Sequence, residues 1–149
     1  ALGGLVWAKD KSMILPIDNA KVFAPGGLAT DGELLWVADW GTGIIWQISF
    51  NGNTPNAPVP VAFGLMNPEG LAWDENGGLL VVETGASRLS RVNLSTGKVT
   101  SIAEGLKLGL PPLEGFPPTW SFDGVAIGKS GKIYVSGFEN NNIYVISKK

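Results

Sequence analysis

The chain of 149 residues contains no cysteine and no histidine. Without cysteine it can form no disulfide, no thiolate nucleophile and no cysteine zinc site. Without histidine it has no imidazole base, no imidazole metal ligand and no Ser-His-Asp triad. Any chemistry in this protein must therefore use carboxylates, hydroxyls, amides or lysine.

Charged residues and long apolar runs are also scarce. The chain has 11 Lys and Arg against 13 Asp and Glu, a net charge of -2, and so lacks the basic excess that phosphate binding needs. No apolar run approaches the ~20 residues of a membrane span. We therefore expect a soluble protein that binds neither nucleic acid nor membrane. The missing cysteine and a first residue other than Met favour a processed, extracytoplasmic protein without fixing the compartment.

What the sequence does contain is a repeat. Residues 27–31 (GLATD) return as 70–74 (GLAWD) and, more loosely, as 124–128 (GVAIG), at steps of 43 and 54 residues. Each copy is followed by two apolar runs, at 34–38 and 44–48, at 79–82 and 88–92, and at 133–135 and 142–146. A loop rich in Gly, Pro and Leu, residues 105–119, explains the longer second step.

These short runs are rich in Val, Ile, Leu and Trp and are separated by Gly, Asn and Asp turns, which is typical of antiparallel strands. Residues 59–63 and 98–103 supply fourth strands, and no window keeps helical spacing. Four-stranded units that repeat every ~40 to 50 residues are typical of β-propeller blades. We therefore predict an all-β chain with three four-stranded antiparallel blades, at about 26–63, 68–104 and 120–149.

The third unit ends after its third strand, and we predict that an N-terminal strand within residues 5–25, such as 22–24, closes it. At ~45 residues per blade the chain supplies about three blades, fewer than the ~4 to 8 that close a ring. An open fan would leave apolar sheet faces in water. We therefore expect half of a six-bladed propeller, completed as a two-fold homodimer or by the missing half of the same propeller.

Three segments carry a family resemblance: 68–74 (PEGLAWD), 78–83 (GLLVVE) and 87–97 (SRLSRVNLSTG). Together they resemble the six-bladed propeller superfamily of NHL repeats, gluconolactonases (senescence marker proteins) and strictosidine-synthase-like proteins, and the resemblance extends over about residues 23–146. It implies the fold but no single function, because lactonases, lyases, synthases and binding proteins share this repeat.

In gluconolactonases a divalent cation, usually calcium, sits in the central channel. The resemblance implies that Glu69 and Asp123, each before a strand glycine, are metal ligands, with Asp123 also as the catalytic base. Gly26 occupies the equivalent place in the first unit, and the asparagine ligands of the family have only Asn67 and Asn140 as nearest counterparts. A carboxylate before glycine is also ordinary turn chemistry, so both interpretations of Glu69 and Asp123 stay open.

Asp39 and Glu83 align at the ends of the second strands of their units. They are candidates for binding a ligand near the channel. The alternative, which we favour, is that each carboxylate accepts backbone N–H bonds in the turn that follows it.

Six tryptophans divide into two groups. Trp36, Trp46 and Trp73 fall inside strands, where we expect them to pack between blades. Trp40 and Trp120 lie in loops and are candidates for a platform that binds a sugar or an aromatic ligand, although such residues often cap a core instead.

Three functions compete. The first is a propeller scaffold that binds a small molecule or a protein partner. The second is a divalent-metal-dependent hydrolase of lactonase type, with Glu69 and Asp123 at the channel and water activated by the cation. The third is a purely architectural half-propeller. We favour the first by a small margin.

Overall fold

The computed structural model describes residues 5–6, 13–15, 22–110, 114 and 123–147. These residues form strands joined by turns, with no α-helix among them. The only helical elements they contain are two single 3-10 turns, η2 (Thr84–Ala86) and η3 (Phe138–Asn140). The prediction of an almost helix-free, all-β chain is confirmed. Within the same residues no helix has the length and apolar character to cross a membrane.

The strands form three main antiparallel sheets, which we call blades 1, 2 and 3. Blade 1 consists of β3 (Pro25–Thr30), β4 (Leu35–Asp39), β5 (Ile44–Ile48) and β8 (Val59–Ala62). Blade 2 consists of β9 (Pro68–Asp74), β10 (Gly78–Glu83), β11 (Arg88–Asn93) and β12 (Val99–Glu104). Blade 3 consists of β13 (Val125–Ile127), β14 (Ile133–Gly137) and β15 (Asn142–Ile146).

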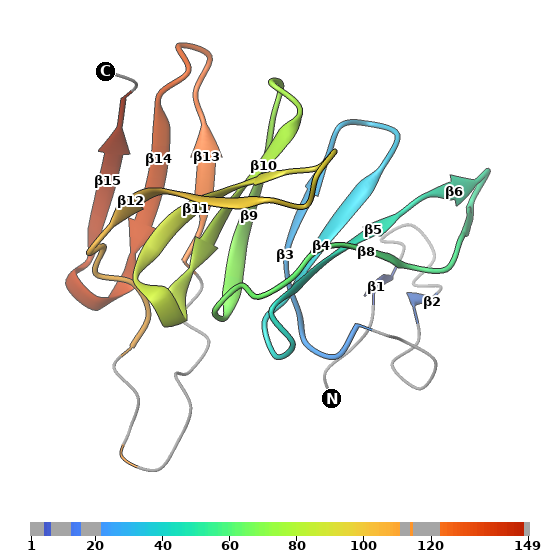
Figure 1. Cartoon of the computed structure of the whole chain (residues 1–149), viewed down its shortest axis with the longest axis horizontal. Coiled ribbons are helices and arrows are strands. Elements are labelled where there is room, and N and C mark those ends of the chain that lie inside the picture. The colour runs from blue at the N-terminus through green and yellow to red at the C-terminus, as the bar shows by residue number, and fades with distance from the viewer. Residues whose placement is uncertain (1–4, 7–12, 16–21, 111–113, 115–122, 148–149) are drawn as a thin grey trace.

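In each blade the strands follow one another in chain order, so the chain runs as a meander from the first strand to the last. Figure 1 shows the three blades side by side, with the first strands β3, β9 and β13 next to one another. These three are the innermost strands of a propeller fan. Each of these first strands overlaps one copy of the repeat found in the sequence.

The core lies between the blades. Along β10, Leu79 and Val81 face blade 1 while Leu80 and Val82 face blade 3, and all four are fully buried. A strand that is covered on both faces needs apolar side chains at successive positions, which is why β10 reads as one continuous apolar run.

Trp36 of blade 1 stacks on Trp73 of blade 2, with ring centroids 5.0 Å apart and ring planes 1° from parallel. The stack lies in the core cluster between these two blades. It confirms packing between blades for Trp36 and Trp73. Trp46 faces the other side of blade 1, where it is buried with Val37 and Ile48.

The N-terminal region differs from the prediction. Residues 22–24 form no strand; instead the backbone N–H groups of Phe23 and Ala24 donate to the Asp39 carboxylate. The strands β1 (Leu5–Val6) and β2 (Met13–Leu15) pair with each other, and β2 lies beside β7 (Thr54–Pro55), which forms a short hairpin with β6 (Phe50–Asn51). Among the described residues blade 3 therefore has three strands, and closure of this blade by an N-terminal strand stays a prediction for an assembled ring.

The inserted loop after blade 2 is partly built into the core. Leu106 and Leu108 are buried in the cluster between blades 2 and 3, and the Lys107 backbone N–H donates to the Tyr144 hydroxyl at 2.9 Å. The loop therefore begins as a packed segment that helps to hold blade 3 in place.

Candidate functional site

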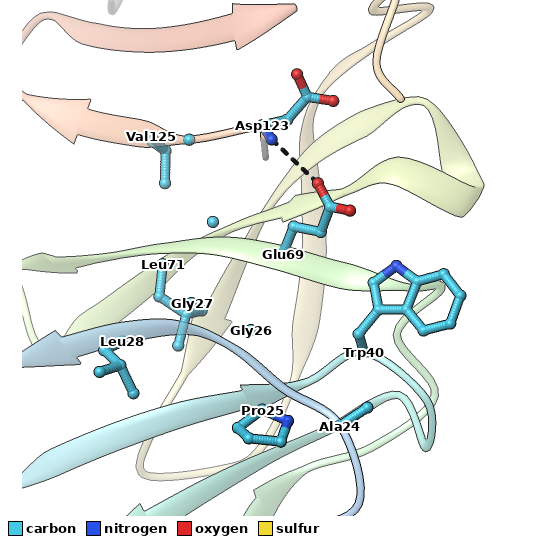
Figure 2. A pocket seen from close by; sticks show the side chains of 12 residues that line it. Ala24, Pro25, Gly26, Gly27, Leu28, Trp40, Glu69, Leu71, Asp123 and Val125 are labelled. Atoms are coloured by element: carbon cyan, nitrogen blue, oxygen red, sulfur yellow. Dashed lines mark hydrogen bonds between the residues drawn. The ribbon is translucent and has the colours of Figure 1, made fainter. Parts of the chain in front are cut away.

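A hollow of about 550 Å³ opens where the innermost strands begin. Figure 2 shows it from close by, with residues of all three blades around it. We call it the central hollow; six side chains that line it are Leu28, Trp40, Glu69, Leu71, Asp123 and Val125. It brings together three of the predicted site residues, Trp40, Glu69 and Asp123. Asp39 and Glu83 are not among its lining residues, and Trp120 lies outside the described residues.

Glycines in the innermost strands allow this convergence. A Cβ atom on Gly70 would lie 2.8 Å from the Asp123 carbonyl oxygen, closer than real contacts allow, so only glycine lets β9 come this near to the start of β13. A Cβ atom on Gly27 would collide in the same way with the Glu69 carbonyl. The strands consequently start close together, and the Asp123 backbone N–H donates to Glu69 Oε2 at 3.1 Å (Figure 2).

Asp123 is 3% exposed, and both its carboxylate oxygens accept backbone hydrogen bonds. Gly109 N–H donates to Oδ2 at 2.5 Å, and Phe138 N–H donates to Oδ1 at 2.8 Å. The carboxylate thus ties the inserted loop and the turn after β14 to the start of β13. This arrangement fixes its orientation at the wall of the hollow, and a role as metal ligand or base stays a prediction.

Asp39 ties together the same region of blade 1. Its carboxylate accepts from Phe23 N–H at 2.8 Å and Ala24 N–H at 3.0 Å, and also from the backbone of Gly41 and Thr42 in the following turn. Burial opposes its ionisation, but the backbone donors, led by Phe23, outweigh burial and hold the pKa of Asp39 below its ordinary value. The contacts to Gly41 and Thr42 are those of the turn alternative favoured from the sequence.

Glu83 is fully buried and accepts four hydrogen bonds. Arg88 donates two, from Nε at 2.8 Å and Nη2 at 3.0 Å, while Ser90 Oγ donates one at 2.5 Å and Met66 N–H one at 2.9 Å. Burial acts to raise the pKa of Glu83, but these bonds, led by that from Arg88, lower it overall. Glu83 therefore joins the end of β10 to β11 and to the segment before β9. None of these donors lies in the turn that directly follows Glu83, so the turn alternative favoured from the sequence does not describe Glu83.

Position for position, Gly137 of blade 3 replaces Asp39 and Glu83. Asp123, which lies just before β13, supplies the missing carboxylate, because it accepts a hydrogen bond from the N–H of Phe138, the residue after Gly137. A carboxylate therefore holds each blade at this end of the fan, and in blade 3 it also forms part of the hollow.

Sequence reasoning missed the apolar lining of the hollow. Leu28, Leu71 and Val125 occupy one position of the repeat, directly after the strand glycine. The sequence did contain a signal for this lining, because an apolar residue follows the strand glycine in all three units.

The acidic side chains of the described residues do not by themselves make up a complete calcium site. Calcium takes six to eight oxygen ligands. In the described part of the chain no group of three or more acidic side chains could hold a metal ion. The Asn67 side chain donates to the Trp40 carbonyl oxygen, and the Asn140 side chain donates to the Tyr144 hydroxyl. Among the described residues, the carboxylates that line the hollow are Glu69 and Asp123, and binding of calcium or another divalent cation stays a prediction for an assembled ring.

No known protein family and no curated protein sequence matches this chain. Solved structures do resemble it. Virginiamycin B lyase from Staphylococcus aureus is 18% identical with a TM-score of 0.57, and the match covers 83% of this chain and 38% of the lyase. A gluconolactonase from Xanthomonas campestris is 17% identical with a TM-score of 0.57, over 87% of this chain and 39% of that one.

A chain of a nidogen/laminin complex is 16% identical with a TM-score of 0.60, over 99% of this chain and 56% of that one. The chain therefore spans roughly two fifths to just over half of these three structures. At such identities the likeness shows the fold and no activity. It confirms the resemblance seen in the sequence at the level of architecture: the chain has a β-propeller fold like that of these three structures.

Proposed function

We propose that this chain is a ligand-binding propeller scaffold that assembles into a six-bladed ring around the central hollow. One observation carries the proposal: three blades deliver Trp40, Glu69 and Asp123 to the wall of one hollow. Concave sites with apolar walls and a few convergent polar groups are the usual form of small-molecule sites.

The lining indicates the chemistry of the ligand. Leu28, Leu71 and Val125 offer apolar surface, Trp40 offers an aromatic ring, and the two acidic residues favour positive charge or hydrogen-bond donors. Neither Lys nor Arg occurs among the described residues that line the hollow. We therefore expect a small organic molecule with an apolar body and an amine or hydroxyl group.

The number of described blades supports the proposed ring. Two four-stranded blades and one three-stranded blade are described, and the matches cover 38% of the lyase and 39% of the gluconolactonase. A ring needs further blades to close the hollow on its open side. The metal-dependent hydrolase is the weaker proposal, because Glu69 and Asp123 alone are too few ligands for calcium. Metal analysis of the purified protein tests it.

Three small aromatic probes of different charge test the binding proposal: benzylamine, benzyl alcohol and phenylacetate. We expect benzylamine to bind most tightly and phenylacetate least, as measured by saturation-transfer NMR and by the rise in melting temperature that binding causes. Glu69→Gln keeps the side-chain shape and an acceptor for the Asp123 N–H but removes the charge, and it should weaken benzylamine binding about tenfold.

Glu75→Gln is the matched control, because Glu75 is exposed in the turn after β9. It should bind benzylamine as the wild type does. Equal binding of all three probes, or unchanged benzylamine binding by Glu69→Gln, would contradict the proposed site. If no probe binds at all, the architectural alternative replaces it.

A further inference from the structure

One face of blade 3 exposes apolar side chains, whereas the equivalent faces of blades 1 and 2 are buried. Ile143 is 71% exposed, whereas the residues at the same position in blades 1 and 2, Ile45 and Leu89, are fully buried. Ile45 packs toward blade 2 and Leu89 packs toward blade 3. No further described blade lies beyond blade 3 (Figure 1).

Tyr134 follows the same rule. It is 38% exposed, while Trp36 and Leu80 at the equivalent positions are at most 1% exposed. Within β13, β14 and β15 the side chains on the open face are uncharged, namely Ala126, Tyr134, Ser136, Ile143 and Val145. A continuous uncharged face of this kind is typical of a surface that takes a partner.

Gly124 points to the identity of that partner. Its counterparts Gly27 and Gly70 are required, because a Cβ atom on either would meet the main chain of the next innermost strand. Among the described residues a Cβ atom on Gly124 would meet only Ser136 Oγ, at 3.7 Å, and its backbone is not left-handed. Gly124 therefore leaves room for the backbone of a further innermost strand, as Gly27 and Gly70 do within the chain.

The other end of the fan shows the complementary half of this contact. Leu28 of β3 is 48% exposed, whereas its counterpart Leu71 in β9 is 7% exposed. Leu71 is buried because blade 1 packs against it, in a cluster with Ala29 and Trp36. At Leu28 the innermost strand of blade 1 therefore lacks the neighbour that blade 1 itself provides for Leu71.

From these observations we infer that a second copy of this chain docks its β3 against β13, so that the open face of blade 3 receives blade 1 of that copy. In the repeat, Gly70 faces the carbonyl of Asp123, so Gly124 would face the carbonyl of Gly26 in the second copy. The same contact forms twice about a two-fold axis and closes six blades. This inference rests on the ring assembly proposed above and identifies its partner and its contact.

One part of blade 1 is already covered in the single chain. Val37, Trp46 and Ile48 on its far face are buried, with Val22 and Phe50 packed against them. In the proposed ring the second copy makes its first contact at the innermost strands, and complete docking requires this cover to be displaced. Association that waits for such a movement is slower than simple diffusional docking.

Light scattering and sedimentation of the wild-type protein over a wide concentration range test the inference. We expect the mass of two chains. Ile143→Lys places a charge on the open face and should give the mass of one chain. Thr100→Lys, on the exposed side of β12, is the control and should remain a dimer.

Gly124→Ala separates docking from folding. It should unfold at the same denaturant concentration as the wild type when both are monomeric, yet dimerise about tenfold or more weakly. Gly70→Ala should instead destabilise the single chain, because its Cβ would meet main-chain atoms of β13 within that chain.

A wild-type mass of one chain at every concentration would overturn the inference, and so would dimers of Ile143→Lys as stable as those of the wild type. Binding of the aromatic probes to the wild-type protein is measured independently of its oligomeric state. A monomer that still binds benzylamine contradicts the docking but not the binding site, and a dimer that binds no probe contradicts the binding site but not the docking.

Discussion

Buried carboxylates hold the blades together at the end of the fan where the hollow lies. Glu83 is the most enclosed of them, and its hydrogen bonds to Arg88, Ser90 and Met66 outweigh burial and lower its pKa. A carboxyl group whose pKa is lower in the folded state stabilises the fold at pH values above its unfolded pKa, ~4.3 for Glu. That stabilisation is lost as the pH falls through the folded pKa. Asp39 acts in the same direction.

Glu83→Gln should lower the free energy of unfolding by about 2 kcal/mol at neutral pH, because the charge of Arg88 loses its partner. The difference from the wild type should shrink below about pH 4, where the wild-type carboxylate becomes protonated. Urea unfolding at a series of pH values measures this, with Glu75→Gln as the control. A difference that stays constant down to acid pH would show that the ion pair contributes nothing to the pH dependence.

The sequence is enough to bring Trp40, Glu69 and Asp123 forward as candidates, because the repeat places two of them before strand glycines. It does not reveal that Asp123 accepts from Gly109 and Phe138. Those donors lie 14 and 15 residues away along the chain, and only the folded loop and the turn after β14 bring them to the carboxylate.

Among the elements, the blades are predictable where apolar runs and glycine turns coincide, as in β9 to β12. Prediction fails where a distant residue decides the local structure. The apolar residues 22–24 favour a strand by composition, but Asp39 takes the backbone N–H groups of Phe23 and Ala24. Leu106 and Leu108 read as part of a loop, yet blade 3 buries them.

The stack of Trp36 on Trp73 should couple blades 1 and 2. Each Trp→Leu substitution should lower the free energy of unfolding by about 2 kcal/mol, through lost packing of a large ring. Because the rings touch, the double variant should show a coupling energy of about 1 kcal/mol in a double-mutant cycle by urea unfolding. Trp73 and Trp46 lie in different core clusters, so the control cycle should show a coupling near zero. Equal coupling in both cycles would contradict a specific stack.

For the whole molecule, the chain length predicts the number of blades, and the structure shows how they are arranged. The 149 residues are enough for three blades, and the three sheets lie in one fan with exposed apolar side chains on the innermost strand at one end and on blade 3 at the other. Leu28 is uncovered at one end, and Ala126, Tyr134 and Ile143 are uncovered at the other. The repeat alone could not show this, because exposure depends on which neighbours are present.

The chain contains no cysteine, so an introduced thiol reports a single contact. Ala29 and Leu71 share the core between blades 1 and 2, and Ala72 and Val125 share that between blades 2 and 3. In the proposed ring the corresponding pair is Ala126 of one copy and Leu28 of the other.

Disulfide trapping is therefore the most direct test of the proposed contact between two copies. Leu28→Cys and Ala126→Cys proteins are made separately, mixed under mild oxidation and analysed by non-reducing electrophoresis. We expect a cross-linked product with the mass of two chains from the mixture and from neither variant alone. A Thr100→Cys copy mixed with either variant should give none. Absence of the mixed product, or an equal yield with Thr100→Cys, would contradict a ring closed through these two ends.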